Sequence, residues 1–460
     1  MKQTVTPPLK KGGRGYRRVG ASSDLCNAHL ATTAGNPPPF FKWGSCWLAG
    51  LFFLSVAAHA APDLTPPADL PPVAAANAAL EAHPAVLAAQ ARVTSAFAEG
   101  RRLTAGEHEY QVRAGYKLRR ESGAGDMNDW EIGVERGLRL GDKARLDTDI
   151  GATLAAEAEE RVGDARHEAA RDLIATWYAA LRGQSDAAAW REQAGLLRQQ
   201  REVVEKRIRA GDAAVMERSQ AEAAWRQAEA EARRAETAAA EADSSLAARF
   251  PALPMPASAS SSGPGTLPAL TGSAGEWVNE ALQHNHELAI LQKASERMRI
   301  LARRQQADLT PDPILGLHYA SERSGQDNLL GVSVTLPLSG ANRRARVDAA
   351  NEEARALAQQ EAGAKARIEG EIRVTHARLQ GTLGRLEAQE EMAGQMERYA
   401  ELAWRAYQLG ETPLWEALNA RRSARDARRE TLLSRLDVHE AAARLLLDSH
   451  RLWPLQESHH

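Results

Sequence analysis

Two segments in each half of the chain alternate apolar and polar residues with a period of two, which is the pattern of a half-buried β-strand. In the first half, Tyr110–Arg120 and Trp130–Leu140 carry this alternation on either side of a polar, glycine-rich turn. In the second half, Leu315–Tyr319 and Leu330–Leu336 carry it, again with a polar loop between them. Each segment predicts a strand with one apolar face and one polar face, and each pair predicts a hairpin.

These strands are long enough to cross a lipid bilayer, because a tilted membrane strand needs about 9–11 residues. The alternation would suit lipid on one face of the sheet and water on the other. The side chains expected to face lipid are Tyr110, Val112, Tyr116, Leu118, Trp130, Ile132, Val134, Leu317, Tyr319, Val332, Val334 and Leu336.

Four strands per chain are too few to enclose a water-filled passage. Open sheet edges in lipid would also leave backbone polar groups unpaired. Oligomerisation resolves both problems, and three copies of the chain would place about twelve strands around one shared lumen. Closure of the sheet therefore predicts a trimer.

Helical periodicity replaces the alternation after each strand pair. Asp142–Arg209 contains no proline, and as one helix it would extend about 100 Å. In the second half, apolar residues recur at steps of three and four between Ile372 and Ala406, with Arg and Glu in the intervening positions. The fold class predicted is mainly α with a small β part.

The two halves repeat the same order of elements with an offset of about 200 residues, which indicates a duplicated domain. One half opens with a helix near Val73–Leu103, and the other opens with a helix near Ala274–Asp308. Between the halves, Pro251–Gly275 is rich in Pro, Ala, Ser and Gly and is expected to be a linker that buries no core. The predicted divisions are an N-terminal region (1–60), a first repeat (61–250), the linker (251–275), a second repeat (276–452) and a tail (453–460).

The N-terminal region has the pattern of an export signal. Lys42 precedes the apolar run Trp47–Val56, and small residues precede Ala61, where cleavage is expected. That run is too short to span a bilayer, and no later stretch approaches the roughly 20 apolar residues of a membrane helix. Cys26 and Cys46 lie in the part expected to be removed, so the mature chain would carry no thiol.

Charge and motifs exclude other classes of function. The formal net charge is -2, with 58 basic and 60 acidic residues mixed along the same segments, so no basic stripe predicts a nucleic-acid partner. No phosphate loop, nucleophile elbow or zinc-ligand spacing predicts an enzyme, a cofactor or a resident metal. His284 and His286 would point to different faces of one predicted helix, so they are interpreted as surface histidines.

Glycine-centred breaks interrupt the long helical stretches at Gly211 and Gly410. Glycine suits the position after a helix end, and Pro413 suits the first turn of the helix that follows. Each break therefore predicts a tight hairpin between two helices. Aligned on the glycines, Glu217 matches Glu416, and both carboxylates could simply favour a helix N-terminus.

With these features in this order and duplicated, the sequence resembles the TolC-type outer-membrane efflux proteins. Overall it is similar to their CzcC-like heavy-metal branch. The resemblance rests on His83-Pro84-x-x-Leu87-x-x-Ala-x-Ala in the first helix, Leu336-Pro337-Leu338 after the last strand, the strand pairs, and the two glycine motifs. It covers residues 70–452. It implies a homotrimer in the bacterial outer membrane, with a twelve-stranded β-barrel continued by an α-helical barrel across the periplasm.

The resemblance also implies a role. Such a protein is the passive exit duct of a tripartite efflux pump or a type I secretion system, and it contacts outer-membrane lipid, a periplasmic adaptor (a membrane fusion protein) and an inner-membrane pump of the RND or ABC type. The hairpin ends would form a closable mouth and an adaptor-docking surface at Arg209, Ala210, Gly211, Tyr407, Leu409 and Gly410.

An acidic constriction is also implied near that mouth. Glu416 matches the first acidic position that the family often has after its second hairpin, whereas Asn419 stands at the second. Glu416, with Glu217, is therefore expected to line a cation-favouring constriction.

One alternative remains open from the sequence. A periplasmic coiled-coil adaptor or scaffold without a pore would share the export signal and the long helices, but it would not need two strand pairs of bilayer-crossing length. The sequence also leaves the exported substrate open among metal ions, organic toxicants and polypeptides.

Overall fold

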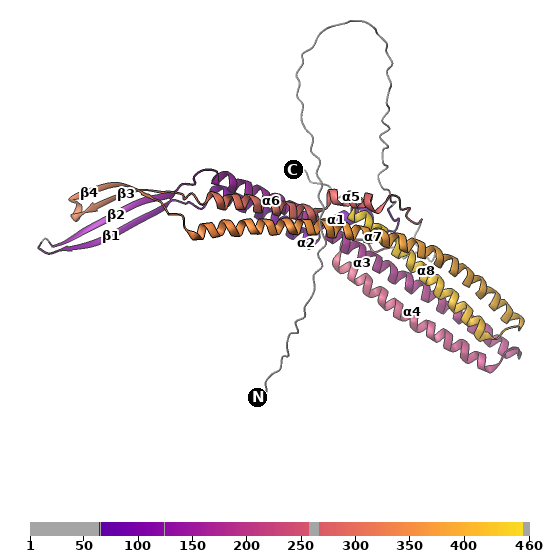
Figure 1. The fold of residues 1–460 in the computed structure, drawn as a ribbon. Helices are drawn as coiled ribbons and strands as arrows, with labels where there is room; N and C mark the ends of the chain where they lie inside the picture. Colours follow the sequence, from indigo (N-terminus) through magenta and orange to yellow (C-terminus); the bar gives the residue numbers. More distant parts are fainter. Residues whose placement is uncertain (1–63, 65, 124, 257–265, 454–460) are drawn as a thin grey trace, which may run out of the picture. The chain divides into compact units, whose positions relative to one another are not determined.

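The same series of elements occurs twice along the chain (Figure 1). The computed structural model describes residues 64, 66–123, 125–256 and 266–453, so the predicted export signal and both cysteines lie outside it. The first series is α1 (Val73–Glu81), α2 (Pro84–Ala105), β1 (Gln111–Glu121), β2 (Gly125–Gly137), α3 (Lys143–Ala210) and α4 (Val215–Arg249). The second is α5 (Ala274–His284), α6 (His286–Ala307), β3 (Ile314–Glu322), the 3-10 turn η1 (Arg323–Gly325), β4 (Asp327–Thr335), α7 (Ala341–Leu409) and α8 (Leu414–Asp448). The mainly α class with a small β part is confirmed.

The helix that was expected to open each half is in fact two helices. Before α2, the His83 side chain accepts a hydrogen bond from the Ala85 N–H at 3.3 Å, and Pro84 occupies the first position of the helix. Before α6, the Asn285 side chain accepts one from the Leu288 N–H at 2.8 Å. Each capping side chain satisfies a backbone donor that a helix start leaves free, which stabilises the break.

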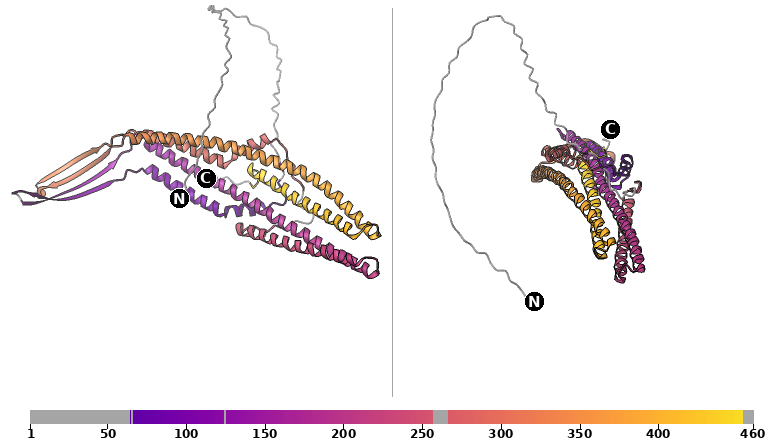
Figure 2. Two further views of the ribbon diagram at one scale, coloured as in Figure 1. Left: turned by 60° about the horizontal axis from the view of Figure 1, so that its bottom comes forward. Right: turned by 90° about the vertical axis from the view of Figure 1, so that its right-hand side faces the viewer.

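Two helices of unusual length connect the strands to the hairpin turns. α3 has 68 residues and α7 has 69, so each extends about 100 Å. As predicted, Gly211 (φ +83°) and Gly410 (φ +80°) end these helices in the left-handed conformation. Figure 2 shows the turns of the α3–α4 and α7–α8 hairpins at the same end of the helices. None of the described helices combines the length and the apolar composition needed to cross a bilayer.

α4 packs on α3 through a seam of small side chains, which we call the alanine seam: Ala221, Ala228, Ala232, Ala235 and Ala239. These buried residues recur at steps of three, four and seven, so they share one face of the helix. On α3, a Cβ added at Gly183 would lie 3.0 Å from the Cα of Ala239. The two helices therefore approach closely because neither carries a large side chain there.

The main core forms where helices of both series meet. Its largest buried side chains include Trp277, Tyr178 and Phe250, which are at most 1% exposed. Asp69, in the segment before α1, accepts hydrogen bonds from the Tyr178 hydroxyl at 3.1 Å and from His439 Nδ1 at 2.8 Å. The N-terminal segment is thus fastened to α3 and α8.

The prediction that the linker 251–275 buries no core is wrong at its ends. Leu253 is 7% exposed and belongs to the main core. Leu270 packs against that core and pairs with Leu64 through an isolated β-bridge. Because these leucines flank the stretch rich in Ser and Gly, composition averaged over the whole segment conceals them.

The four strands form one antiparallel sheet in the order β1-β2-β3-β4. The middle pairing joins the two halves of the chain, with Ile132 opposite Tyr319 and Val134 opposite Leu317. β2 begins at Gly125, so the first hairpin turn is shorter than the predicted polar loop. The register brings the apolar positions of all four strands onto the same face, as the alternation requires.

Candidate functional site: the exposed sheet and the hairpin tips

The apolar face of the sheet is exposed to solvent in the single chain. Val112 on β1 is 72% exposed, Ile132 on β2 is 49% exposed, and Val332 on β4 is 76% exposed. Of the residues expected to face lipid, Tyr319 alone is only partly exposed; its ring centroid lies 5.4 Å from that of Trp130. Tyr110 and Leu336 lie just outside the strands and are also exposed. A continuous apolar surface of this kind is unusual for a water-soluble face and marks a site of contact with something else.

The opposite face of the sheet is polar and crossed by ion pairs. Arg113 lies 3.5 Å from Glu135, Lys117 lies 3.4 Å from Glu131, and Arg119 lies 2.8 Å from Asp129. Each pair bridges β1 and β2. This face therefore suits contact with water, in contrast to the other.

Arg136 interrupts the apolar alternation of β2, and the structure shows why it is tolerated. Its guanidinium lies 4.6 Å from the ring centroid of Tyr110 and donates to the His108 backbone carbonyl at 3.0 Å. The charge is thus placed at the end of the sheet, over an aromatic face rather than among the valines.

A cluster of charged side chains joins the two halves of the chain beside the sheet. Lys143, only 1% exposed, donates hydrogen bonds to the Thr310 carbonyl and to Asp312 Oδ1, each at 2.7 Å. Asp308 lies 3.4 Å from the same ammonium group. Burial alone would raise the pKa of Asp312, but the hydrogen bonds from Lys143 and from the Leu140 N–H lower it. Sequence reasoning missed this cluster, because its members are more than 160 residues apart.

The hairpin tips expose most of the residues predicted to form the docking surface. Arg209, Ala210, Gly211, Leu409 and Gly410 are exposed, Leu409 by 70% of its surface. The first turns of α4 and α8 add further exposed apolar side chains, namely Val215, Met216 and Trp415. The tips therefore carry an apolar surface together with at least one cation.

Tyr407 differs from the other predicted tip residues because it is buried, with 3% of its surface exposed. It packs with Val204, Ala221, Leu414 and Leu418, so the cluster draws on both hairpins. Tyr407 thus lies beneath the tips and holds them together instead of forming part of their surface.

A polar contact accompanies this packing. The Tyr407 hydroxyl donates a hydrogen bond to Glu217 Oε2 at 2.8 Å, which connects α7 to α4. The guanidinium of Arg207 lies 4.5 Å from the Tyr407 ring centroid and donates to its carbonyl at 3.3 Å. Burial and the hydrogen bond to Glu217 raise the pKa of Tyr407 to about 12, so the hydroxyl remains a donor at neutral pH. We call Arg207, Glu217 and Tyr407 the tip latch.

The two acidic residues predicted for a constriction differ in their surroundings. Glu217 is half-buried and engaged in the tip latch. Glu416 is also half-buried, in the first turn of α8, and within the described part of the chain its carboxylate forms no ion pair. Glu416 is thus the freer of the two charges.

Four histidines gather where α3, the α5–α6 junction and the end of α8 meet. The ring centroid of His450 lies 5.3 Å from that of His167, 5.9 Å from that of His284 and 5.2 Å from that of His286. The prediction that His284 and His286 diverge on one helix is wrong, because Asn285 separates α5 from α6 and both rings reach His450.

Burial holds two members of this cluster, His167 and His450, in the neutral form. Burial lowers the pKa of His167 to about 3, with a contribution from Arg171. Burial and the neighbouring His286 and His284 lower the pKa of His450 to about 4. Within residues 66–123, 125–256 and 266–453, no group of three or more His, Cys, Asp or Glu side chains is arranged to hold a metal ion. At neutral pH, His167 and His450 are therefore uncharged groups packed between the helices.

Residues 277–447, which run from α5 almost to the end of α8, match the family described as outer membrane efflux protein. The predicted resemblance to the TolC-type outer-membrane efflux proteins is confirmed. The description places that family in the outer membrane, which agrees with the location predicted from the sequence. No curated protein matches the sequence.

Solved structures share the fold over most of the chain. The outer membrane protein VceC from Vibrio cholerae matches with a TM-score of 0.64 and 17% identity, covering 83% of this chain and 95% of its own. CusC matches with a TM-score of 0.68 and 15% identity, covering 85% and 98%. The outer-membrane channel OprN matches with a TM-score of 0.69 and 16% identity, covering 83% and 90%. At these identities the likeness establishes a common fold.

Proposed function

We propose that this protein is the outer-membrane channel of a tripartite efflux pump or a type I secretion system, acting as a passive exit duct. The observation that carries the proposal is the sheet, whose apolar face is exposed while its opposite face holds ion pairs. Lipid against one face and water against the other would satisfy both surfaces. A pore-less adaptor would leave the same apolar face in water, which disfavours that alternative.

The unpaired edges of the sheet support a homotrimer. β1 and β4 are the edge strands, and within the described chain each pairs on one side only. In lipid an unpaired edge is costly, because its N–H and C=O groups find no water. Pairing of β1 with β4 of a second copy would continue the sheet, and three copies would close it around one lumen.

The hairpin tips are the proposed contact with the rest of the pump. Leu409 and its exposed neighbours Val215, Met216 and Trp415 offer an apolar surface, and Arg209 adds a positive charge. A periplasmic adaptor with apolar and acidic side chains at its end would fit this surface, and it would connect the channel to an inner-membrane pump of the RND or ABC type.

A cation-favouring constriction is proposed beside the tips, lined by Glu416 and, when the tip latch is open, by Glu217. A ring of carboxylates at a narrow point of a pore selects ions by charge. Glu416→Gln is expected to lower the preference of single channels for cations over anions in planar bilayers. An unchanged selectivity would show that Glu416 does not face the lumen.

The membrane assignment is tested by two neighbouring positions on β4. Val332 and Ser333 are both exposed, but they point to opposite faces of the sheet. Val332→Lys should destabilise the membrane-inserted form by roughly 2–4 kcal/mol, because a lysine near the middle of the bilayer loses its hydration. Ser333→Lys should be tolerated, because its ammonium group would face water.

The measurement is the amount of oligomer that remains in the outer-membrane fraction and migrates as a multimer without heating. Loss of that species in Val332→Lys but not in Ser333→Lys supports the duct. Equal amounts of oligomer in both variants would contradict the lipid-facing assignment.

A further inference from the structure

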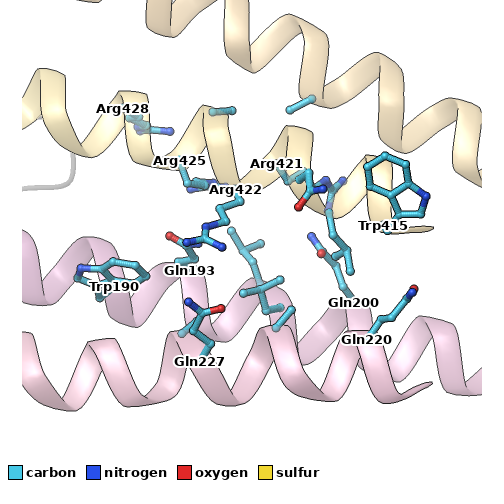
Figure 3. Close-up of a pocket in the computed structure, with 18 of the residues that line it drawn as sticks. Trp190, Gln193, Gln200, Gln220, Gln227, Trp415, Arg421, Arg422, Arg425 and Arg428 are labelled. Carbon is cyan, nitrogen blue, oxygen red and sulfur yellow. The ribbon is translucent and has the colours of Figure 1, made fainter. Parts of the chain in front are cut away.

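A pocket of about 600 Å³ lies between the two hairpins and extends to the first turn of α8 at Trp415 (Figure 3). All four hairpin helices line it: Trp190 and Gln200 come from α3, Gln227 comes from α4, Glu397 comes from α7, and Trp415 comes from α8. The volume lies in the range of pockets that hold small molecules. Figure 3 shows the arginines of α8 facing the polar side chains of α3 and α4 across this space.

Three of the four arginines that line the pocket have carboxylate partners. Arg425 pairs with Glu192 at 2.7 Å, and Arg428 pairs with Glu397 at 3.6 Å. Arg422 lies 3.8 Å from Asp426, one turn along α8. These three charges are therefore balanced within the chain.

Arg421 is the exception. Its guanidinium lies 3.9 Å from the ring centroid of Trp404, which supports the cation through its π-face, and no carboxylate among the described residues forms an ion pair with it. Burial, together with the charge of Arg425, lowers the pKa of Arg421, which shows how little the surroundings compensate this cation. A half-buried guanidinium without a counter-charge favours an anion from outside the chain.

Gln200 supplies a second polar group whose hydrogen-bonding capacity is not satisfied within the described chain. It is 7% exposed, and its side-chain oxygen has no hydrogen-bond partner within the described chain. Figure 3 shows this side chain extending from α3 toward α8. Because a half-turn of the terminal torsion exchanges the oxygen and the NH₂ group, Gln200 can present either an acceptor or a donor to a molecule in the pocket.

We propose that this pocket binds a small organic anion with an aromatic or apolar body. The acidic group would accept hydrogen bonds from Arg421 and Gln200, while the body would lie on the same side of the pocket as the indole of Trp415, beside the apolar side chains of Leu197 and Leu418. Since Gln200 and Arg421 belong to different hairpins, the bound anion would join the hairpins and favour their closed arrangement. The site would thus regulate the duct, a role beyond that of a passive channel.

The test is isothermal titration calorimetry. The full-length protein, purified from membranes and placed in lipid nanodiscs, is titrated with 2-naphthalenesulfonate. Empty nanodiscs serve as the blank, and naphthalene-2-sulfonamide serves as a neutral analogue of similar shape. One sulfonate is expected to bind per chain, and the sulfonamide is expected to bind at least about tenfold more weakly, because it lacks the charge.

Substitutions distinguish binding in the pocket from nonspecific attraction of the anion to positive charges elsewhere on the protein. Arg421→Gln should weaken sulfonate binding by about 10–100-fold, and Gln200→Leu should weaken it by about tenfold. Arg405→Gln is the matched control, because Arg405 is an exposed arginine on α7 that does not line the pocket. Its affinity should stay within about twofold of that of the unsubstituted protein.

Absence of sulfonate binding, or equal weakening by Arg421→Gln and Arg405→Gln, would overturn the proposal. If Arg421→Gln fails to fold by circular dichroism, Arg421→Lys keeps the charge but loses the planar pair of donors, and an affinity equal to that of the unsubstituted protein would likewise overturn the proposal. Conductance in planar bilayers without added anion tests the duct separately, so the two proposals can fail independently.

Discussion

Replacing Lys143 with methionine is expected to lower the free energy of unfolding by about 3–5 kcal/mol, because it leaves the largely buried Asp312 carboxylate without its cation. The Lys143 ammonium group holds Asp312 Oδ1 and the Thr310 carbonyl, each at 2.7 Å, and it is almost completely buried. Methionine fills a similar volume, so the loss would come from the charge and not from a cavity. The measurement is the thermal midpoint of the helical circular dichroism signal.

The control for Lys143→Met is Arg145→Met, two residues along the same helix. Arg145 also contacts two carboxylates, Asp142 at 3.0 Å and Asp149 at 3.1 Å, but its side chain is 59% exposed. Exposed ion pairs contribute at most about 1 kcal/mol, so the midpoint should move little. If both variants had the same thermal midpoint, burial of Lys143 would not explain its contribution to stability.

Removing one hydroxyl group, in Tyr407→Phe, is expected to loosen the hairpin tips. The lost hydrogen bond to the Glu217 carboxylate is worth about 1.5–3 kcal/mol, which shifts the balance between joined and separated tips by about 10–100-fold. Amide hydrogen exchange in the segments around residues 204–221 and 405–418 should become faster by a comparable factor. Under the proposed function, single channels should also open more often.

Tyr399→Phe controls for the loss of a tyrosine hydroxyl on the same helix. Tyr399 is 50% exposed, and its hydroxyl has no hydrogen-bond partner among the described residues. Exchange at the tips should therefore be unchanged in Tyr399→Phe. Unchanged exchange in Tyr407→Phe as well would show that apolar packing alone joins the tips.

The features that the sequence predicted well are those with a short and regular signal. Alternation places Val112, Val134 and Val332 on one face because strand side chains alternate by geometry, whatever the sheet packs against. The ends of the longest helices were equally clear, since Gly211 and Gly410 suit a conformation that other residues adopt at a cost. The fold class follows from these two signals together.

The features that the sequence did not predict depend on contacts between distant residues or on a single cap. Asn285 ends a helix by accepting one hydrogen bond, so the periodicity on either side conceals the break. Tyr407 and Glu217 are 190 positions apart, and only the packing of the two hairpins brings them together. Among the described residues no carboxylate pairs with Arg421. This likewise depends on the side chains that pack around it, which the periodicity of the sequence does not reveal.

The alanine seam makes the α3–α4 hairpin sensitive to substitutions that enlarge a side chain, which replacement by alanine does not test. Systematic replacement by alanine would pass over Ala235 and Ala239 without changing them, and the interface would look dispensable. Any larger side chain there would have to push α4 away from Gly183, because the backbones already touch. The lack of space therefore limits which side chains this hairpin accepts, and replacement with leucine would reveal an interface that replacement with alanine overlooks.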